Sequence, residues 1–308
     1  MNAKRGCLIL FAAIAIVACI ALTTFAMRYQ ALDDDAESIV LTPDISDVTY
    51  CTMDGLPQKL DIYFPSTRDP DAMPLLVYVH GGGFTGGDKR KGSAIVDIPA
   101  MTERGYVVAA VNYRLAPKYK FPAPLNDVKC AIRFLRANAT MYKIDPKRVG
   151  IWGGSAGGHL AAFVGLTDSS AGFDVGEYSS QSSSVRAVGD LFGPTDFTAE
   201  FSLPQKLLLY RAFETLDSQA PILKQASPVN YISHAAPPFL ILQGEQDDVV
   251  PLSQSQLLHD RLQAANVDVT LVVVKNANHN FAPTGGAISP SRGELSKMLG
   301  DFFDRTMK

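Results

Sequence analysis

The stretch "RVGIWGGSAGGHLAAFVGL", residues 148 to 166, decides the fold of this chain. Its first part is an apolar run typical of a buried strand, its second part predicts a helix start built from small residues, and Ser155 stands at the junction. Gly153, Ser155 and Gly157 satisfy the pattern G-x-S-x-G, in which a sharp, strained turn lifts a serine hydroxyl above a sheet. Larger side chains at the flanking positions would collide in such a turn. An ordinary glycine-rich turn or a phosphate-binding loop can show the same letters, so the motif needs support from the rest of the chain.

The rest of the chain contains further strand-like runs that are continuously apolar rather than alternating, which is typical of parallel strands buried on both faces. Helical patterns stand between them, most clearly at 125–138, where Asn126 or Asp127 is expected to cap the start. Strands alternating with helices predict an α/β chain with a doubly wound, mostly parallel sheet and helices on both faces. The mixed segment 196–226 interrupts this alternation and predicts a small helical cap. The strand-like runs are 75–79, 106–111, 148–152, 185–191, 239–243 and 269–274.

The loop "HGGGF", residues 80 to 84, directly follows the first of these strands. Loops of this type supply backbone N–H groups to a substrate oxygen in lipases and esterases. Gly82 and Gly83 bring bare backbone close to a ligand, and the N–H of Ala156 is expected to join them in an oxyanion hole. A nucleotide-binding P-loop is excluded, because Asp88 stands where that motif requires lysine.

A candidate acid and a candidate base follow two later strands. The segment "GEQDDVVP" offers Asp247, with Asp248 as the rival acid, and "KNANHNF" offers His279. A serine becomes nucleophilic beside an imidazole, which in turn needs a carboxylate to fix its tautomer. Ser155, Asp247 and His279 occur in the chain order of the α/β-hydrolases. All of these candidates follow the carboxyl ends of strands, where ligand sites of open α/β sheets lie.

The remaining histidines are expected to serve other purposes. His80 is interpreted as holding its loop, and His159 points along the helix that follows Ser155, without a carboxylate partner. His234 and His259 are placed on a loop and a helix. His279 is therefore the predicted base.

Composition excludes some function classes. The 308 residues include 28 Lys and Arg against 31 Asp and Glu, a formal net charge of -3, so the chain has no basic field for nucleic acid. It contains no HExxH pattern and no paired Cys/His spacing, so no metal or organic cofactor is expected.

The N-terminus carries an uncharged run from Gly6 to Met27, which is long enough to cross a bilayer. Lys4 and Arg5 precede it, which favours export of the remainder of the chain. Three fates are compatible with the run: a retained membrane anchor, which we favour, a signal peptide cut after Ala26, or a lipoprotein acylated at Cys19. The predicted organisation is therefore a membrane anchor or signal segment at 1–32 and a catalytic domain at 33–308, with membrane contact through the first segment.

Two cysteines, Cys51 and Cys130, lie in the expected domain. They can pair if the domain is exported, but sequence does not establish their proximity. Because free cysteine is frequently buried, two buried thiols are the favoured expectation.

Together, "HGGGF", "NYRLAPKYKFPAPLNDVKCAIRFLRANA", "IDPKRVGIWGGSAGGHLAA", "GEQDDVVP" and "NHNF" resemble the α/β-hydrolase esterases of the hormone-sensitive lipase-like group, particularly its feruloyl and acetyl esterases. The similarity spans about residues 45 to 305. It implies an α/β-hydrolase fold with an eight-stranded, mostly parallel sheet, and ester hydrolysis through an acyl-enzyme. Asp247 matches the triad acid of that group. Its usual histidine-glycine pair is Gln243 and Gly244 here, a departure expected to have no evident effect on chemistry.

The expected activity is hydrolysis of small acyl or aryl esters by a serine hydrolase. Amide cleavage of the aryl formamidase or exopeptidase kind is an alternative with the same triad, and a noncatalytic ligand-binding module is a rival of another class. The substrate pocket is expected to be lined by the loop after Gly83, by 196–226 and by the neighbourhood of Phe281. Neither the natural ester nor the oligomeric state follows from the sequence.

Overall fold

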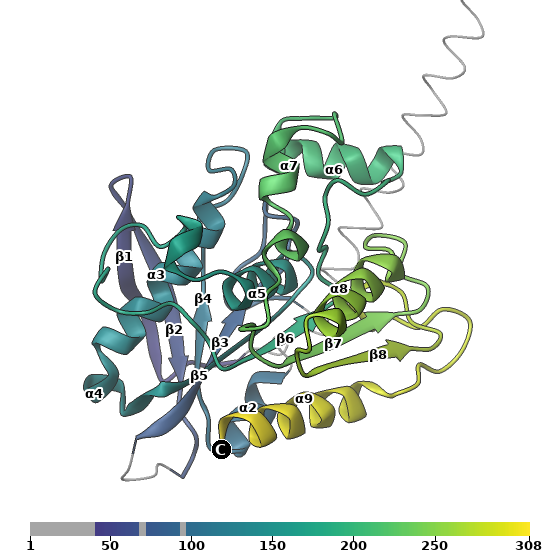
Figure 1. Ribbon diagram of the computed structural model, residues 1–308. Coiled ribbons are helices and arrows are strands. Elements are labelled where there is room, and N and C mark those ends of the chain that lie inside the picture. Colours follow the sequence, from purple (N-terminus) through teal and green to yellow (C-terminus); the bar gives the residue numbers. More distant parts are fainter. Residues whose placement is uncertain (1–40, 68–71, 93–96) are drawn as a thin grey trace, which may run out of the picture.

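A computed structural model of the chain describes residues 41–67, 72–92 and 97–308, and its centre is an eight-stranded sheet (Figure 1). The strand order is β1-β2-β4-β3-β5-β6-β7-β8. The pairs β1·β2 and β2·β4 are antiparallel, and all others are parallel. The mostly parallel sheet predicted from the sequence is thus confirmed. The strands are β1 Ile45–Met53, β2 Leu56–Tyr63, β3 Met73–Val79, β4 Val107–Val111, β5 Ile144–Gly154, β6 Ala187–Leu191, β7 Phe239–Gly244 and β8 Val269–Val274.

Helices cover both faces of the sheet (Figure 1). Alternate residues of a strand point to opposite faces, so β3 sends Leu75, Val77 and Val79 into one core and Leu76 and Tyr78 into the other. Residues of α3, α5 and α8 fill the first core, and residues of α2 and α9 fill the second. Burial on both faces explains the continuously apolar runs of the sequence. The helices are α2 Ile98–Glu103, α3 Ala123–Ala137, α4 Ala139–Tyr142, α5 Ala156–Leu166, α6 Leu203–Phe213, α7 Pro221–Gln225, α8 Leu252–Ala264 and α9 Arg292–Met307.

The six predicted strands are all present, as β3 to β8. The apolar-run criterion missed the hairpin of β1 and β2, because β1 is an edge strand whose residues are largely exposed at its start. The strand β8 is also less buried than its sequence predicts, since it forms the opposite edge of the sheet. Both departures from the pattern of burial on two faces therefore concern edge strands.

The predicted caps of α3 are wrong. The helix begins at Ala123 after Pro122, so Asn126 and Asp127 lie inside it. Asp127 is fully buried and accepts hydrogen bonds from the backbone N–H of Arg114, 2.8 Å, and from its guanidinium. This carboxylate therefore fixes the chain after β4 rather than the start of a helix.

The insertion 196–226 contains two helices, α6 and α7, beyond one end of the sheet, as the predicted cap required (Figure 1). A capping box starts α6, with Ser202 and Gln205 bonded reciprocally. The Gln205 amide also donates to the backbone oxygens of Asp248 and Val249, each at 3.0 Å. This bond pair attaches α6 to the loop after β7.

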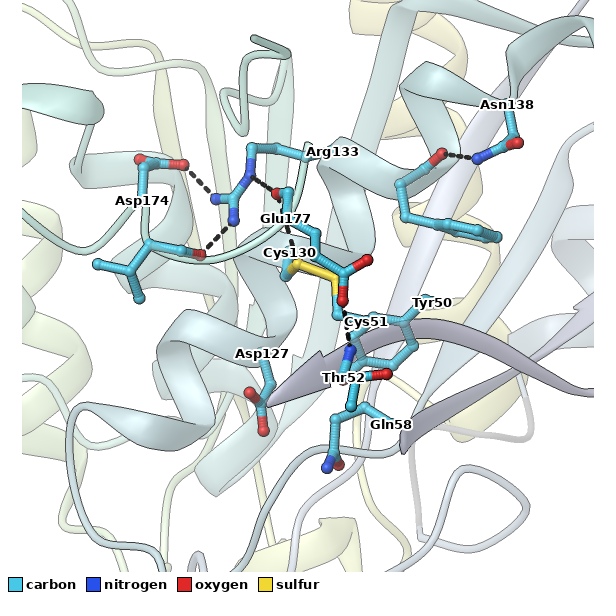
Figure 2. The surroundings of a disulfide bond; sticks show 12 residues. Tyr50, Cys51, Thr52, Gln58, Asp127, Cys130, Arg133, Asn138, Asp174 and Glu177 are labelled. Carbon is cyan, nitrogen blue, oxygen red and sulfur yellow. Dashed lines mark hydrogen bonds and ion pairs between the residues drawn. A yellow bond between two sulfur atoms is a disulfide. The ribbon is translucent and has the colours of Figure 1, made fainter. Parts of the chain in front are cut away.

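A disulfide joins Cys51 of β1 to Cys130 of α3, with 6.5 Å between the Cα atoms (Figure 2). The expectation of two free thiols is wrong, because it lacked the hairpin that places β1 against α3. The loop that contains Asp174 and Glu177 closes over the bond. Arg133 of α3 pairs with Asp174 at 2.8 Å and donates to the Glu177 backbone oxygen at 3.1 Å.

The predicted anchor at Gly6 to Met27, Cys19 and the boundary at residue 32 lie outside the described residues. Within 41–67, 72–92 and 97–308, no helix combines the length and the apolar character needed to span a bilayer.

Candidate active site

Ser155 lies in a strained turn between β5 and α5, as the sequence pattern predicts. Its backbone has φ 55° and ψ -121°, outside the helical and extended regions. A Cβ added at Gly153 would lie 2.5 Å from the Val79 backbone oxygen, and one at Gly157 would lie 2.0 Å from the same atom. Glycine is therefore required on both sides of the turn. The Ser155 N–H donates to the Leu191 oxygen of β6 at 2.8 Å, which holds the turn against the sheet.

The structure brings together the three residues that the sequence proposed as nucleophile, base and acid. His279 Nε2 lies 3.1 Å from Ser155 Oγ, and His279 Nδ1 lies 2.8 Å from Asp247 Oδ2. All three residues are buried, at 8% exposure for the serine, 2% for the histidine and 7% for the aspartate. The rival acid Asp248 is exposed.

Four donors surround the Asp247 carboxylate. Oδ1 accepts the backbone N–H groups of Val249, 2.9 Å, and Val250, 2.8 Å. Oδ2 accepts from His279 Nδ1 and from Gln243 Nε2, both at 2.8 Å. An ionised carboxylate only accepts, so Nδ1 of the imidazole carries the proton and Nε2 offers its lone pair to the serine hydroxyl. This is the tautomer that a general base requires.

The sequence reasoning missed the contribution of Gln243 to this site. The only signal was its position, four residues before Asp247, where the resemblance to the hormone-sensitive lipase-like group implies histidine. Its side chain contacts the carboxylate at 2.8 Å, and whether this departure affects the chemistry stays a prediction.

Aromatic packing positions the imidazole. His279 opens a short 3₁₀ turn, His279–Phe281, that follows β8. The Phe192 ring packs against the imidazole with 4.7 Å between centroids and against Phe281 at 4.9 Å. Phe281 is buried in the core beneath α9. The sequence predicted that its neighbourhood lines the substrate pocket, but Phe281 is not among the residues that line the cavity beside Ser155. Its contribution is to support Phe192.

A small apolar cavity of about 40 Å³ opens beside Ser155. The loop after Gly83 and the 196–226 insertion both line it, as the sequence predicts. Such a volume accommodates a short acyl chain, since about 10–15 Å³ is enough for one water molecule. The lining residues are Gly83, Phe84, Ser155, Ala156, Pro194, Phe201, Gln205, Leu208, Leu209, Val249 and Val250.

Two of the three predicted oxyanion-hole residues, Gly83 and Ala156, line this cavity together with Ser155. Gly82 is not among the lining residues, and it shapes the loop. Its φ of +108° is unfavourable for other residues, and its oxygen accepts the N–H groups of Thr85 and Gly86, both at 3.0 Å.

His80 and His159 are neutral, buried side chains with local partners. His80 Nδ1 lies 2.7 Å from the Gly81 oxygen, and its ring stacks on Tyr113 at 4.2 Å, in accord with a loop-holding role. His159 Nδ1 lies 2.9 Å from the Pro194 oxygen. Burial lowers the pKa of each imidazole to about 4.

The other two histidines lie at the surface. His259 on α8 contacts Asp260 at 3.0 Å, and His234 is exposed. In the part of the chain that the structure describes, no group of three or more His, Cys, Asp or Glu side chains is arranged to hold a metal ion.

Comparison with known proteins shows that the chain is similar to esterases. The chain is 30% identical to "Esterase LipC" of Mycobacterium tuberculosis over 238 residues, 75% of this chain and 58% of that protein. It is 32% identical to "Esterase LipQ" of the same organism over 264 residues, 82% of this chain and 61% of that protein. The chain thus spans less than two thirds of the length of these relatives.

Solved structures show the same architecture. A "Truncated form of carbohydrate esterase from gut microbiota" has a TM-score of 0.72 and 29% identity, covering 88% of this chain and 98% of that chain. The propionate-bound esterase Est2 of Thermogutta terrifontis has a TM-score of 0.71 and 25% identity, covering 85% of this chain and 94% of that chain. The family model BD-FAE matches residues 60–262. The chain therefore belongs to the BD-FAE family and has the α/β-hydrolase fold of esterases.

Proposed function

We propose that the chain is a serine carboxylic ester hydrolase that acts on small acyl or aryl esters through Ser155, His279 and Asp247. The observation that carries this proposal is the pair of contacts that His279 makes, 3.1 Å to Ser155 and 2.8 Å to Asp247, beside an apolar cavity. The relatives named as esterases support the reaction class.

The mechanism follows from these contacts. His279 Nε2 takes the hydroxyl proton while Ser155 Oγ attacks the carbonyl carbon of the ester. Asp247 stabilises the imidazolium, and backbone N–H groups of Gly83 and Ala156, which line the cavity, receive the oxyanion. The imidazolium then protonates the departing alkoxide, which leaves an acyl-enzyme. A water molecule, deprotonated by the same imidazole, attacks the carbonyl carbon of this ester. The imidazolium then returns the proton to Ser155 Oγ as the acyl–Oγ bond breaks, which releases the carboxylic acid.

The cavity favours a short acyl group. Its walls are almost entirely apolar, and a volume of about 40 Å³ between Phe201, Leu208 and Leu209 favours a short chain over a long one. Propionate, which is bound in the Thermogutta structure, is an acid of this size.

We also propose that the domain acts outside the cytoplasm, retained at the membrane by the run from Gly6 to Met27. The Cys51–Cys130 disulfide supports export, because such bonds persist in oxidising compartments. Alkaline-phosphatase fusions after residue 40 test this: high phosphatase activity supports export, and fractionation then separates a retained anchor from a cleaved or acylated product. A fusion that is inactive while stably expressed would contradict export.

Hydrolysis of p-nitrophenyl esters of graded acyl length, with acetyl and feruloyl carbohydrate esters and matched anilides alongside, tests the activity. We expect the highest kcat/KM for acyl groups of about two to four carbons, as the cavity size implies, and little cleavage of anilides. A fluorophosphonate should label the wild type but not Ser155→Ala. Wild-type turnover by Ser155→Ala, or a folded wild type that neither turns over esters nor takes the label, would refute the proposal.

A further inference from the structure

We propose that Gln243 is a positioning residue that fixes the Asp247 carboxylate and tunes its interaction with His279. Its side chain is fully buried at the end of β7, and Nε2 donates to Asp247 Oδ2 at 2.8 Å. This is the oxygen that also contacts His279. The inference rests on the proposed function, since it concerns the same triad.

Three contacts fix the orientation of the Gln243 amide. Nε2 faces two close acceptors, Asp247 Oδ2 and the Val250 oxygen, the latter at 3.1 Å, and the Gly244 oxygen lies farther away at 3.5 Å. On the other side, the Ser255 hydroxyl of α8 donates to Oε1 at 2.7 Å. A flipped amide would place its oxygen against both acceptors, so the network permits one orientation.

The shared oxygen gives this contact a role beyond packing. Each hydrogen bond to a carboxylate withdraws part of the charge that would otherwise stabilise the imidazolium. Gln243 therefore moderates the basicity that Asp247 confers on His279, and it does so without titrating. Asp247 and His279 are the titratable side chains that contact this network among the described residues, since Asp190 on neighbouring β6 bonds to Gly193 instead.

The decisive variant is Gln243→Met, which keeps the length of the side chain and removes the donor. We expect kcat to fall about 10- to 100-fold, the range for a hydrogen bond to a charged group, with KM little changed. The midpoint of the acid limb of the kcat/KM–pH profile should move to higher pH, because the carboxylate no longer shares its Oδ2 with an amide donor and holds the imidazolium more strongly.

A matched control is Gln254→Met. Gln254 is also a buried glutamine near the site, but its amide contacts Thr195 and Asp196. This variant should lose comparable stability and keep the wild-type midpoint. A shift of the same size in both variants would assign a merely structural role to Gln243 and overturn the proposal.

Gln243→His introduces a second side chain that can donate to the carboxylate and acts as the rescue variant. Above about pH 7 its neutral imidazole can donate to Asp247, so most activity should return. At lower pH this second imidazole gains a proton and competes with His279 for the Asp247 carboxylate. The acid limb of the log(kcat/KM)–pH profile should then have a slope of two instead of one, because two protons inactivate the enzyme. An acid limb identical to that of the wild type would contradict the proposal.

The two proposals fail differently. If the wild type neither hydrolyses esters nor takes the fluorophosphonate, the proposed function fails. If the wild type does both and Gln243→Met shows the wild-type profile, only the positioning role fails. If Gln243→Met does not fold, Ser255→Ala is the deciding variant, because it removes the hydroxyl that holds the Gln243 amide in place. The midpoint of the acid limb should then move to higher pH by a smaller amount than for Gln243→Met. An unchanged midpoint would overturn the inference.

Discussion

Removal of the Cys51–Cys130 disulfide should cost the domain a large part of its stability. The bond closes a loop with a sequence separation of 79 residues, and it links β1 to α3 across one core. The chain-entropy relation for a loop of that length gives about 4.5 kcal/mol at 25 °C. For a domain of this size that corresponds to a fall in Tm of roughly 8–10 °C. Both cysteines are at most 1% exposed, so the small cavities left by alanine can only add to the loss.

The assay is thermal unfolding, followed by circular dichroism, of the wild type and of the double variant Cys51→Ala with Cys130→Ala. The wild type is measured with and without a reductant, and thiol alkylation with mass spectrometry verifies complete reduction. Reduced wild type and double variant should unfold within a few degrees of each other. The double variant is its own control, since a reductant should leave its Tm unchanged.

A particular result would refute the reasoning. If full reduction moves the wild-type Tm by less than about 2 °C, the bond does not restrict the unfolded chain as the loop length requires. The polar contacts around the bond, such as Arg133 with Asp174, would then be sufficient to hold this corner. Ester hydrolysis at 25 °C should survive reduction, because the triad lies on other elements than β1 and α3.

Three further variants test other parts of the structure. Burial raises the pKa of Asp190 from 3.8 to about 7, so the folded state keeps a proton that the unfolded state releases; stability falls as pH rises from about 4 to 7. In urea unfolding, the free energy of unfolding of Asp190→Asn relative to the wild type should therefore increase by up to about 4 kcal/mol from pH 4 to pH 8. The same difference between the two proteins at both pH values would contradict this. Leu209→Ala enlarges the apolar cavity, so the ratio of kcat/KM for octanoyl esters to kcat/KM for acetyl esters should rise about tenfold. An unchanged ratio would show that the acyl group does not bind in this cavity. Asp247→Asn should lower kcat about 10⁴-fold with little effect on KM, measured as initial rates; a loss below about tenfold would exclude Asp247 as the acid.

The sequence was sufficient to predict the features that depend on local chemistry. The strained turn at Ser155 requires glycines on both sides, and their spacing forms a recognisable sequence motif, G-x-S-x-G. The strands that precede Ser155 and Asp247 are buried on both faces near their ends, and all three strands, including the half-buried edge strand before His279, are visible as continuous apolar runs. Their parallel arrangement then placed the three residues at one edge.

Features that depend on contacts between distant segments were not predictable. The pairing of Cys51 with Cys130 follows from a β-hairpin that alternates polar and apolar residues and lies at the sheet edge. The burial of Asp127 depends on Arg114, and no helix-capping rule anticipates that partner. The neighbourhood of Phe281 was expected at the pocket, yet this side chain turns into the core and supports Phe192.

The cavity beside Ser155 and the proposed acid, Asp247, are joined by one set of hydrogen bonds. Gln205 of α6 lines the cavity and donates to the oxygens of Asp248 and Val249, whereas the Val249 N–H donates to Asp247. A substrate or substitution that moves α6 is therefore expected to displace the peptide groups of Asp248 and Val249, and with them the donor to the Asp247 carboxylate. The rate and the chain-length preference are consequently coupled, and a single rate measured on an α6 variant does not separate them. The ratio of kcat/KM between two esters does, because a change in the acid affects both substrates equally.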